Sequence, residues 1–148
     1  MATKTFQYRY ALKTSPEVIY AYLSKPESYK KLSPLIHAVE NIQEQHEDGL
    51  RVISYTSVEK FRFLGFIPYS NPIRIQMTFT RPNEQIVTIV RTRFGVKVDF
   101  IFELTQDAHG CLMTETITVH APRWLAGFVM KQARQVQQVR AAALNTLT

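Results

Sequence analysis

The chain has 148 residues, of which 45% are hydrophobic and 20% charged, and its formal net charge is +6 at pH 7. This length and composition are typical of a globular protein with a closed core, so we expect a single domain over residues 1–148. The lysines and arginines are scattered, with no run of five or more, which argues against a nucleic-acid-binding tail and a nucleic-acid partner. A basic chain still favours anionic membranes or acidic partners in a general way.

Cysteine and histidine usage limits the redox and metal chemistry of the chain. Cys111 is the only cysteine, so an intramolecular disulfide and a thiolate metal cluster are both excluded. The histidines lack metal-ligand spacing, and the sequence indicates no metal site and no cofactor. The chain starts without an apolar signal core, and its longest apolar stretch, around residues 63–69, is too short to span a bilayer. We therefore expect a cytoplasmic protein.

The first part of the chain predicts one strand followed by two short helices. Residues 5–12 alternate apolar and polar side chains, as a half-buried strand does. Residues 14–17, Thr-Ser-Pro-Glu, then give a helix start with a hydroxyl cap, a proline in the first turn and an early acid. A second short helix is expected over residues 26–32, and it ends at Ser33-Pro34.

The chain from Leu35 onward predicts six further strands joined by short turns. Strands joined in this way are antiparallel neighbours. A seven-stranded antiparallel sheet twists and curls, so its concave face needs a cover. The six predicted strands are residues 35–44, 50–63, 73–80, 86–94, 96–105 and 112–120.

The stretch from Pro122 to Leu147 predicts one long amphipathic helix that provides this cover. Pro122 suits a first helical position, and only Gly127 interrupts the helix-forming residues that follow. Polar residues including Lys131, Arg134 and Arg140 are expected on the solvent side. A curved sheet that grips such a helix leaves a cavity between them. The apolar stripe at a spacing of three or four residues comprises Leu125, Phe128, Val129, Ala133, Val136, Val139, Ala143, Leu144 and Leu147.

Three segments in this order resemble the START-related (SRPBCC) superfamily, which includes birch-pollen-allergen-type proteins, polyketide cyclases and coenzyme Q-binding proteins. The segments are TSPEVIYAYLSKPESYKKLSPLI, GCLMTETITVHAP and RWLAGFVMKQARQVQQVRAAALNTL. The resemblance implies an α+β helix-grip fold, in which a curved antiparallel sheet of about seven strands surrounds a long C-terminal helix. It also implies one START-like domain that binds a hydrophobic or amphipathic small molecule. The superfamily has no universal catalytic motif, so no catalytic residue is carried over.

Counting residues by two across the glycine turn within residues 86–105 assigns side chains to the two faces of the sheet. A hairpin loop of two or four residues places Arg91 on the same face as Val98, and Arg93 on the same face as Val96. The valines belong to an apolar set that is expected to be buried. Both arginines are therefore expected to point toward the concave side.

The same counting places Phe100, Met113 and Glu115 on the concave face. Together with Arg91 and Arg93, Glu115 predicts a polar foot in an apolar cavity. An arginine would bind a carboxylate, phosphate or keto oxygen of the ligand, and Glu115 would orient it. Two alternatives remain. Glu115 could simply neutralise an arginine in a buried ion pair, or a bulge could shift the register and put both arginines in water.

Tyr55 and Phe128 complete the set of candidate ligand-binding residues. The hydroxyl of Tyr55 could donate to a ligand carbonyl, although such tyrosines are more often core residues with a satisfied hydroxyl. Phe128 lies on the apolar stripe of the long helix. His37 could line the cavity mouth, but a surface or capping role is the simpler interpretation.

The segment from Phe61 to Tyr69 is too aromatic for a routine surface loop. Gly65 and Pro68 interrupt a regular strand pattern within it. One interpretation is a roof over the cavity that opens for the ligand. A second is a patch that touches a membrane surface, and a third is that the side chains fold back into the core.

Three functions compete at this point. We expect non-catalytic binding or transport of a lipid, isoprenoid or polyketide-like molecule, because the sequence shows no strong acid–base or nucleophile constellation. The alternative is a polyketide cyclase/dehydrase-like enzyme that acts on a ligand in the same cavity. The third is a protein-interaction module that uses a sheet edge or the aromatic segment. The sequence identifies neither the ligand nor the oligomeric state.

Overall fold

The computed structural model describes residues 1–63, 67–92 and 95–147, with side chains placed for all of these except 61–63 and 67–70. None of the described helices is long and apolar enough to cross a membrane. The helical elements are α1 (Pro16–Leu23), the short 3-10 turn η1 (Pro26–Ser28), α2 (Tyr29–Leu32) and α3 (Arg123–Leu144). The strands are β1 (Ala2–Leu12), β2 (Ile36–Glu47), β3 (Leu50–Phe63), β4 (Ile67–Arg81), β5 (Gln85–Arg91), β6 (Lys97–Asp107) and β7 (Gly110–Ala121).

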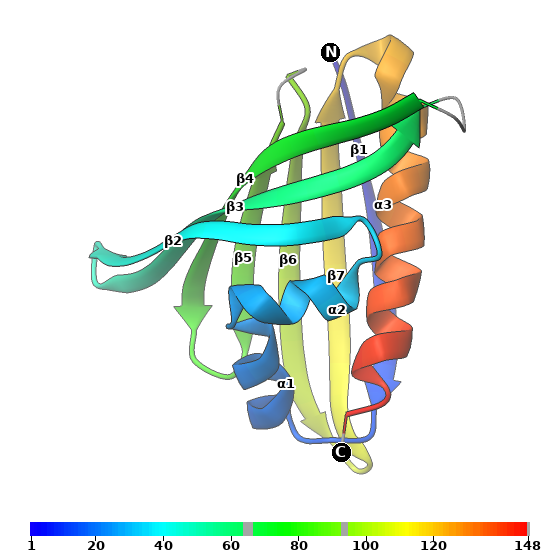
Figure 1. The fold of residues 1–148 in the computed structure, drawn as a ribbon. Coiled ribbons are helices and arrows are strands. Elements are labelled where there is room, and N and C mark those ends of the chain that lie inside the picture. Colours follow the sequence, from blue (N-terminus) through cyan, green and yellow to red (C-terminus); the bar gives the residue numbers. More distant parts are fainter. Residues whose placement is uncertain (64–66, 93–94, 148) are drawn as a thin grey trace.

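All these strands form one antiparallel sheet in the order β1-β7-β6-β5-β4-β3-β2. The first and last strands of the chain therefore lie side by side, and every other neighbour is a hairpin partner. The sheet curls so far that β2, β3 and β4 run across β5, β6 and β7, with α3 along one side and the short helices at one end (Figure 1). The predicted α+β helix-grip fold is confirmed.

Local sequence signals account for the connections between these elements. Asp48 and Gly49 occupy the two central positions of the β2–β3 turn with φ of 52° and 79°. Two left-handed residues make the hairpin turn whose twist matches the strands, and Asp-Gly is among its preferred sequences. At the start of α1, the Ser15 side chain accepts a hydrogen bond from the Val18 amide at 3.4 Å, as predicted for a hydroxyl cap.

The orientation of α3 differs from the predicted one. Its fully buried residues are Ala126, Met130, Ala133, Gln137, Arg140 and Leu144. Phe128 and Val139, expected on the buried stripe, are 45% and 39% exposed. The prediction that Arg140 faces solvent is wrong. The helix places two alanines and a polar pair against the sheet, and part of its apolar stripe faces a cavity instead.

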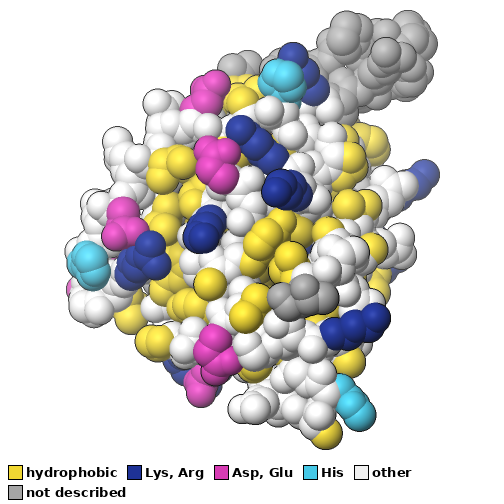
Figure 2. Space-filling view, turned by 60° about the horizontal axis from the view of Figure 1, so that its bottom comes forward, with side chains coloured by type: hydrophobic (Ala, Val, Ile, Leu, Met, Phe, Trp, Pro, Cys, Tyr) yellow, Lys and Arg dark blue, Asp and Glu magenta, His cyan; other side chains and the backbone are white. Residues whose placement is uncertain are grey.

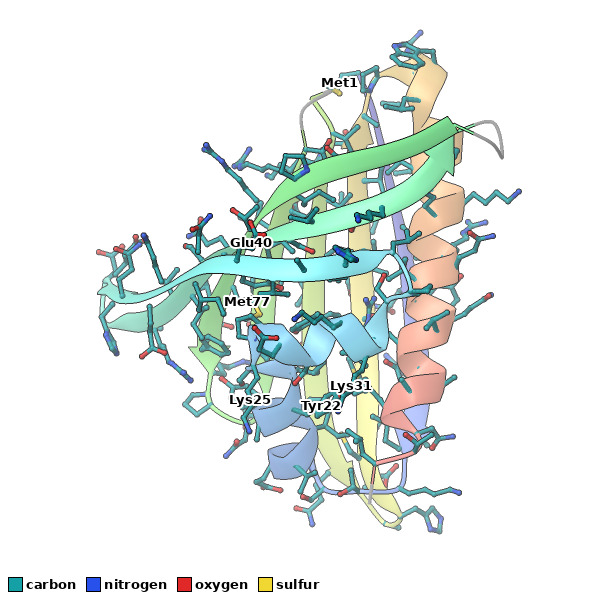
Figure 3. The ribbon with its side chains drawn as sticks, in the orientation of Figure 1. Met1, Tyr22, Lys25, Lys31, Glu40 and Met77 are labelled. Atoms are coloured by element: carbon teal, nitrogen blue, oxygen red, sulfur yellow. The ribbon has the colours of Figure 1, made fainter. Side chains whose placement is uncertain are left out.

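The core continues from the concave face of the sheet to the short helices. Met77 on β4 is fully buried among the side chains between the sheet and these helices (Figure 3). A second cluster, which includes Val119 and Ala126, packs the start of α3 against β6 and β7. On the surface, lysines and arginines are interspersed with acidic and hydrophobic side chains over the face shown in Figure 2.

We expect Gly110→Ala to destabilise the fold by roughly 2–3 kcal/mol, measured as the free energy of unfolding in urea. A Cβ atom at Gly110 would lie 2.6 Å from the Leu12 carbonyl oxygen and 2.7 Å from that of Thr14, and the φ of Gly110 is 144°. Gly127→Ala is the matched control, because a Cβ there meets nothing within 4 Å and alanine favours the helix by about 0.5–1 kcal/mol. Equal effects of the two substitutions would contradict the close approach of β7 to the β1–α1 connection.

Candidate functional site

A cavity of about 460 Å³ lies between the concave face of the sheet and α3. Its walls come from α2 and the segment after it, from β3, β4, β5 and β6, and from one side of α3. Apolar side chains make most of the surface, including Ile73, Ile75, Val90, Val98 and Phe100. These residues face inward because each occupies an alternate position along its strand. The fold therefore encloses an apolar space of a size that accommodates a small organic ligand.

The polar centre of the structure is Glu115 on β7, which is fully buried. Its Oε1 accepts hydrogen bonds from Arg140, with Nε at 2.8 Å and with Nη2 also in contact. Its Oε2 accepts from the Tyr10 hydroxyl at 2.5 Å and from Gln137 Nε2 at 3.2 Å. Burial, with Glu115 nearby, raises the pKa of the Tyr10 hydroxyl far above its usual value, so Tyr10 remains a donor. The inward orientation predicted for Glu115 is correct.

The arginine that pairs with Glu115 comes from α3. The Arg140 side chain is 5% exposed, lines the inner part of the cavity, and stacks over two rings. Its guanidinium carbon is 5.3 Å from the ring centre of Phe100 and 5.1 Å from that of Phe102. The guanidinium thus makes cation–π contacts with both rings, and the carboxylate of Glu115 neutralises its charge. A buried ion pair between Glu115 and an arginine is one of the alternatives left open by the sequence. The structure has such a pair, but its arginine is Arg140 and not Arg91 or Arg93.

Arg91 does not face the cavity. It is exposed on the outer face of β5, where it pairs with Lys97, and Val90 pairs with Val98. The connection between Arg91 and Lys97 contains five residues, 92–96, and an odd number reverses the parity obtained from a loop of two or four. The inward prediction for Arg91 is therefore wrong by one position. Arg93 lies outside the described residues.

The other predicted ligand-binding residues are divided between cavity and core. Tyr55, Phe100 and Phe128 line the cavity. Trp124, one turn before Phe128 on α3, also lines it and is 80% exposed. Met113 is instead fully buried in the core, where its sulfur accepts a hydrogen bond from the Tyr10 hydroxyl at 3.2 Å.

Two tyrosines differ in whether their hydroxyls are satisfied. Tyr29 donates to the Leu23 carbonyl oxygen at 2.6 Å, whereas Tyr55 has no hydrogen-bond partner among the described residues. Burial raises the pKa of both hydroxyls, so each is a neutral donor at physiological pH. Tyr55 lines the cavity, so its role as a donor to a ligand stays a prediction.

Glu59 and Asn71 are cavity residues that the sequence analysis missed. They are directly paired across β3 and β4, and both contribute to the cavity wall. Burial raises the pKa of Glu59 to about 7. The signal was present in the sequence, because Glu59 is four positions beyond Tyr55 on the same strand and shares its face.

The remaining candidates contribute no further chemistry to this site. His37 is exposed at the start of β2, and Cys111 is a buried free cysteine whose pKa is raised by burial. Within the part of the chain that the structure describes, no group of three His, Cys, Asp or Glu side chains could hold a metal ion. The interpretations offered for the aromatic segment depend on residues 64–66 and on side chains between 61 and 70, which lie outside the described set.

Comparison with solved structures places this fold among the proteins expected from the resemblance. A START superfamily protein from Mycobacterium smegmatis superimposes with a TM-score of 0.71 at 18% identity, covering 97% of this chain and 94% of that one. The allergen Ara h 8.0201 gives 0.63 at 16% identity, covering 98% and 100%. The di-domain ARO/CYC StfQ from the steffimycin biosynthetic pathway gives 0.70 at 9% identity, covering 97% and 50%.

These likenesses establish the class of fold. The chain has the helix-grip architecture shared by START proteins, this allergen and the aromatase/cyclase, and it spans half the length of the latter. Neither a family model nor a curated protein matches the sequence. The identities are low, so the activity is argued from the cavity itself.

We expect Glu115→Ala and Arg140→Ala each to destabilise the protein by about 3–5 kcal/mol, because each leaves one charge buried without its partner. The double variant Glu115→Leu/Arg140→Met replaces both groups by apolar side chains and should recover most of this loss. Urea unfolding of the four proteins measures the coupling. Additive losses, with no recovery in the double variant, would show that the two groups do not depend on each other.

We expect Glu59→Gln to stabilise the protein above pH 7 and to change little at pH 4.5. The folded-state pKa of about 7 exceeds the value of 4.5 for a free glutamate, so the folded protein binds more protons between these values. Wild-type stability must then fall as pH rises through this window, by about 3 kcal/mol, and the glutamine variant lacks this term. Thermal unfolding of both proteins at pH 4.5 and pH 8 provides the measurement. A melting-temperature difference that does not change with pH would show that Glu59 is not desolvated.

Proposed function

We propose that this chain binds or transports a hydrophobic or amphipathic small molecule, such as a lipid, isoprenoid or polyketide-like compound, without transforming it. The observation that carries this proposal is the cavity of about 460 Å³ with apolar walls and few polar groups. Burying a ligand's hydrocarbon surface against such walls is favourable by about 25 cal/mol per Å². The few polar groups would then orient the ligand.

The charged groups near the inner part of the cavity support binding over catalysis. Arg140 and Glu115 neutralise each other and are both buried, and Gln137 and Tyr10 complete the hydrogen bonds of Glu115. A general acid or base must reach the reacting atom while free to exchange its proton. Both oxygens of Glu115 accept hydrogen bonds within the protein, so this carboxylate suits a structural role.

A polyketide cyclase/dehydrase-like enzyme is the second candidate, and one observation favours it. Glu59 and the Tyr55 hydroxyl both face the cavity, and a carboxyl group with a pKa of about 7 is matched to proton transfer at physiological pH. One structural neighbour, the di-domain ARO/CYC StfQ from the steffimycin biosynthetic pathway, agrees with this alternative. Turnover of a poly-β-keto substrate, lost in Glu59→Gln, would favour the enzyme; binding without turnover would favour the carrier.

We expect Val90→Phe to fill the cavity and weaken the binding of Nile red, a neutral apolar dye, by tenfold or more. Val90 lines the cavity, so the added ring occupies the space that the dye needs. Val87→Phe makes the same change on the same strand but on the other face of the sheet, and it should leave the dissociation constant unchanged. Fluorescence titration measures both. Equal dye binding by the two variants and the wild type would place the dye outside the cavity and contradict the proposed function.

A further inference from the structure

At the end of the cavity formed by β3 and β4, two polar side chains have hydrogen-bonding groups that the described part of the fold leaves unused. Glu59 and Asn71 are directly opposite each other in the β3–β4 register, and both line the cavity. Side chains opposed in this way have Cβ atoms about 5 Å apart, so one small polar group can contact both. The neighbouring walls, including Ile73 and Val96, are apolar.

Asn71 presents an acceptor that lacks a donor. Its side chain is 6% exposed, and its Oδ1 atom has no hydrogen-bond partner within the described part of the protein. A buried amide oxygen without a donor destabilises the folded protein. A donor that reaches this oxygen from the cavity would remove that cost.

Glu59 presents a second acceptor, which has no cation beside it among the described side chains. None of the hydrogen bonds or ion pairs among the described residues involves its carboxyl group. Burial without a partner is also the reason that its pKa is raised to about 7. Among the described residues of the cavity wall, the other charged one is Arg140, which is already neutralised by Glu115. The charge that these residues leave available to a ligand is therefore negative and lies at Glu59.

We infer that Glu59 and Asn71 form a subsite for the protonated amine of an amphipathic ligand whose apolar part fills the rest of the cavity. This inference rests on the proposed function and specifies its ligand class. An ammonium group has three N–H donors and can serve both acceptors at once, whereas an alcohol has one donor. Its charge holds Glu59 ionised, and the proton that Glu59 carried passes to solvent. A carboxylate ligand would instead meet the negative group directly.

The test compares three chains of equal length, decylamine, decanol and decanoate, as competitors of Nile red at pH 7.5. We expect the wild type to bind decylamine at least tenfold more tightly than decanol, with decanoate weakest. Glu59→Gln should lose the preference for the amine while it retains Nile red. Glu40→Gln is the matched control, because Glu40 is exposed on β2 and its substitution changes the net charge equally (Figure 3). This control should keep the wild-type order.

Two further measurements sharpen the result. Asn71→Leu keeps a side chain of similar volume and should weaken decylamine several-fold with little change for Nile red. Calorimetry of decylamine binding in buffers of different ionisation enthalpy should detect proton release in the wild type and none in Glu59→Gln.

The possible failures are distinguishable. Nile red binding without a preference for decylamine, or an equal loss of preference in Glu40→Gln, would overturn the amine subsite and leave the proposed cavity binding intact. A preference for decanoate would overturn the subsite and point to Arg140 as the ligand's partner. Failure of Nile red and all three chains to bind would overturn both proposals.

Discussion

The contact between Glu115 and α3 is the interaction on which the rest of this structure depends. Glu115 lies in the middle of β7 with no access to water, so its charge must be balanced within the protein. Gln137 and Arg140 supply that balance from consecutive turns of α3, and they fix both the position of the helix along the sheet and its rotation. An apolar interface alone would tolerate a small rotation of the helix about its own axis, whereas this contact specifies one orientation.

The orientation set in this way also creates the cavity. Since Gln137 and Arg140 must point at β7, the side of α3 that carries Val136 and Phe128 cannot be packed against the sheet. Ala133 belongs to the core cluster that packs α3 against the sheet and also lines the cavity. The apolar stripe is thereby divided, with one part closing the core and the other left facing an enclosed space. A stability requirement and a binding surface are thus two results of one polar contact.

Much of the fold could be predicted because its signals are local. Alternating strands, the Asp48-Gly49 turn and the Ser15 cap each depend on a few consecutive residues, and the structure has all three. The rotation of α3 could not be obtained in this way, because the residue that attracts Arg140 is 25 positions away in the sequence. From the sequence, Arg140 is expected on the solvent side of the helix because it is charged and is not part of the apolar stripe.

The candidate site shows the same division. The inward orientation of Glu115 followed from strand alternation, which is local. The orientation of Arg91 required the number of residues in a hairpin loop, and a miscount by one reverses every side chain on the strand. Glu59 could have been found by continuing the alternation from Tyr55. An unpaired carboxyl group on an inner face is unfavourable for stability, so a general expectation of buried apolar residues does not predict it there.

The pairing of β1 with β7 has a consequence for how the protein is made. Ala2 lies opposite Ala121, so β1 can find its neighbour only after the six strands that follow it have been synthesised. Until then β1 is an unpaired strand, and contacts of such sequence separation slow folding. The α3 residues that neutralise Glu115 emerge later still. Hairpins of β2 to β6 can form as the chain grows, but the addition of β7 and β1 to the sheet and the docking of α3 come later. A nascent chain therefore exposes the edge of β6, which β7 covers in the folded protein, and a chaperone that shields strand edges would act on it during that interval.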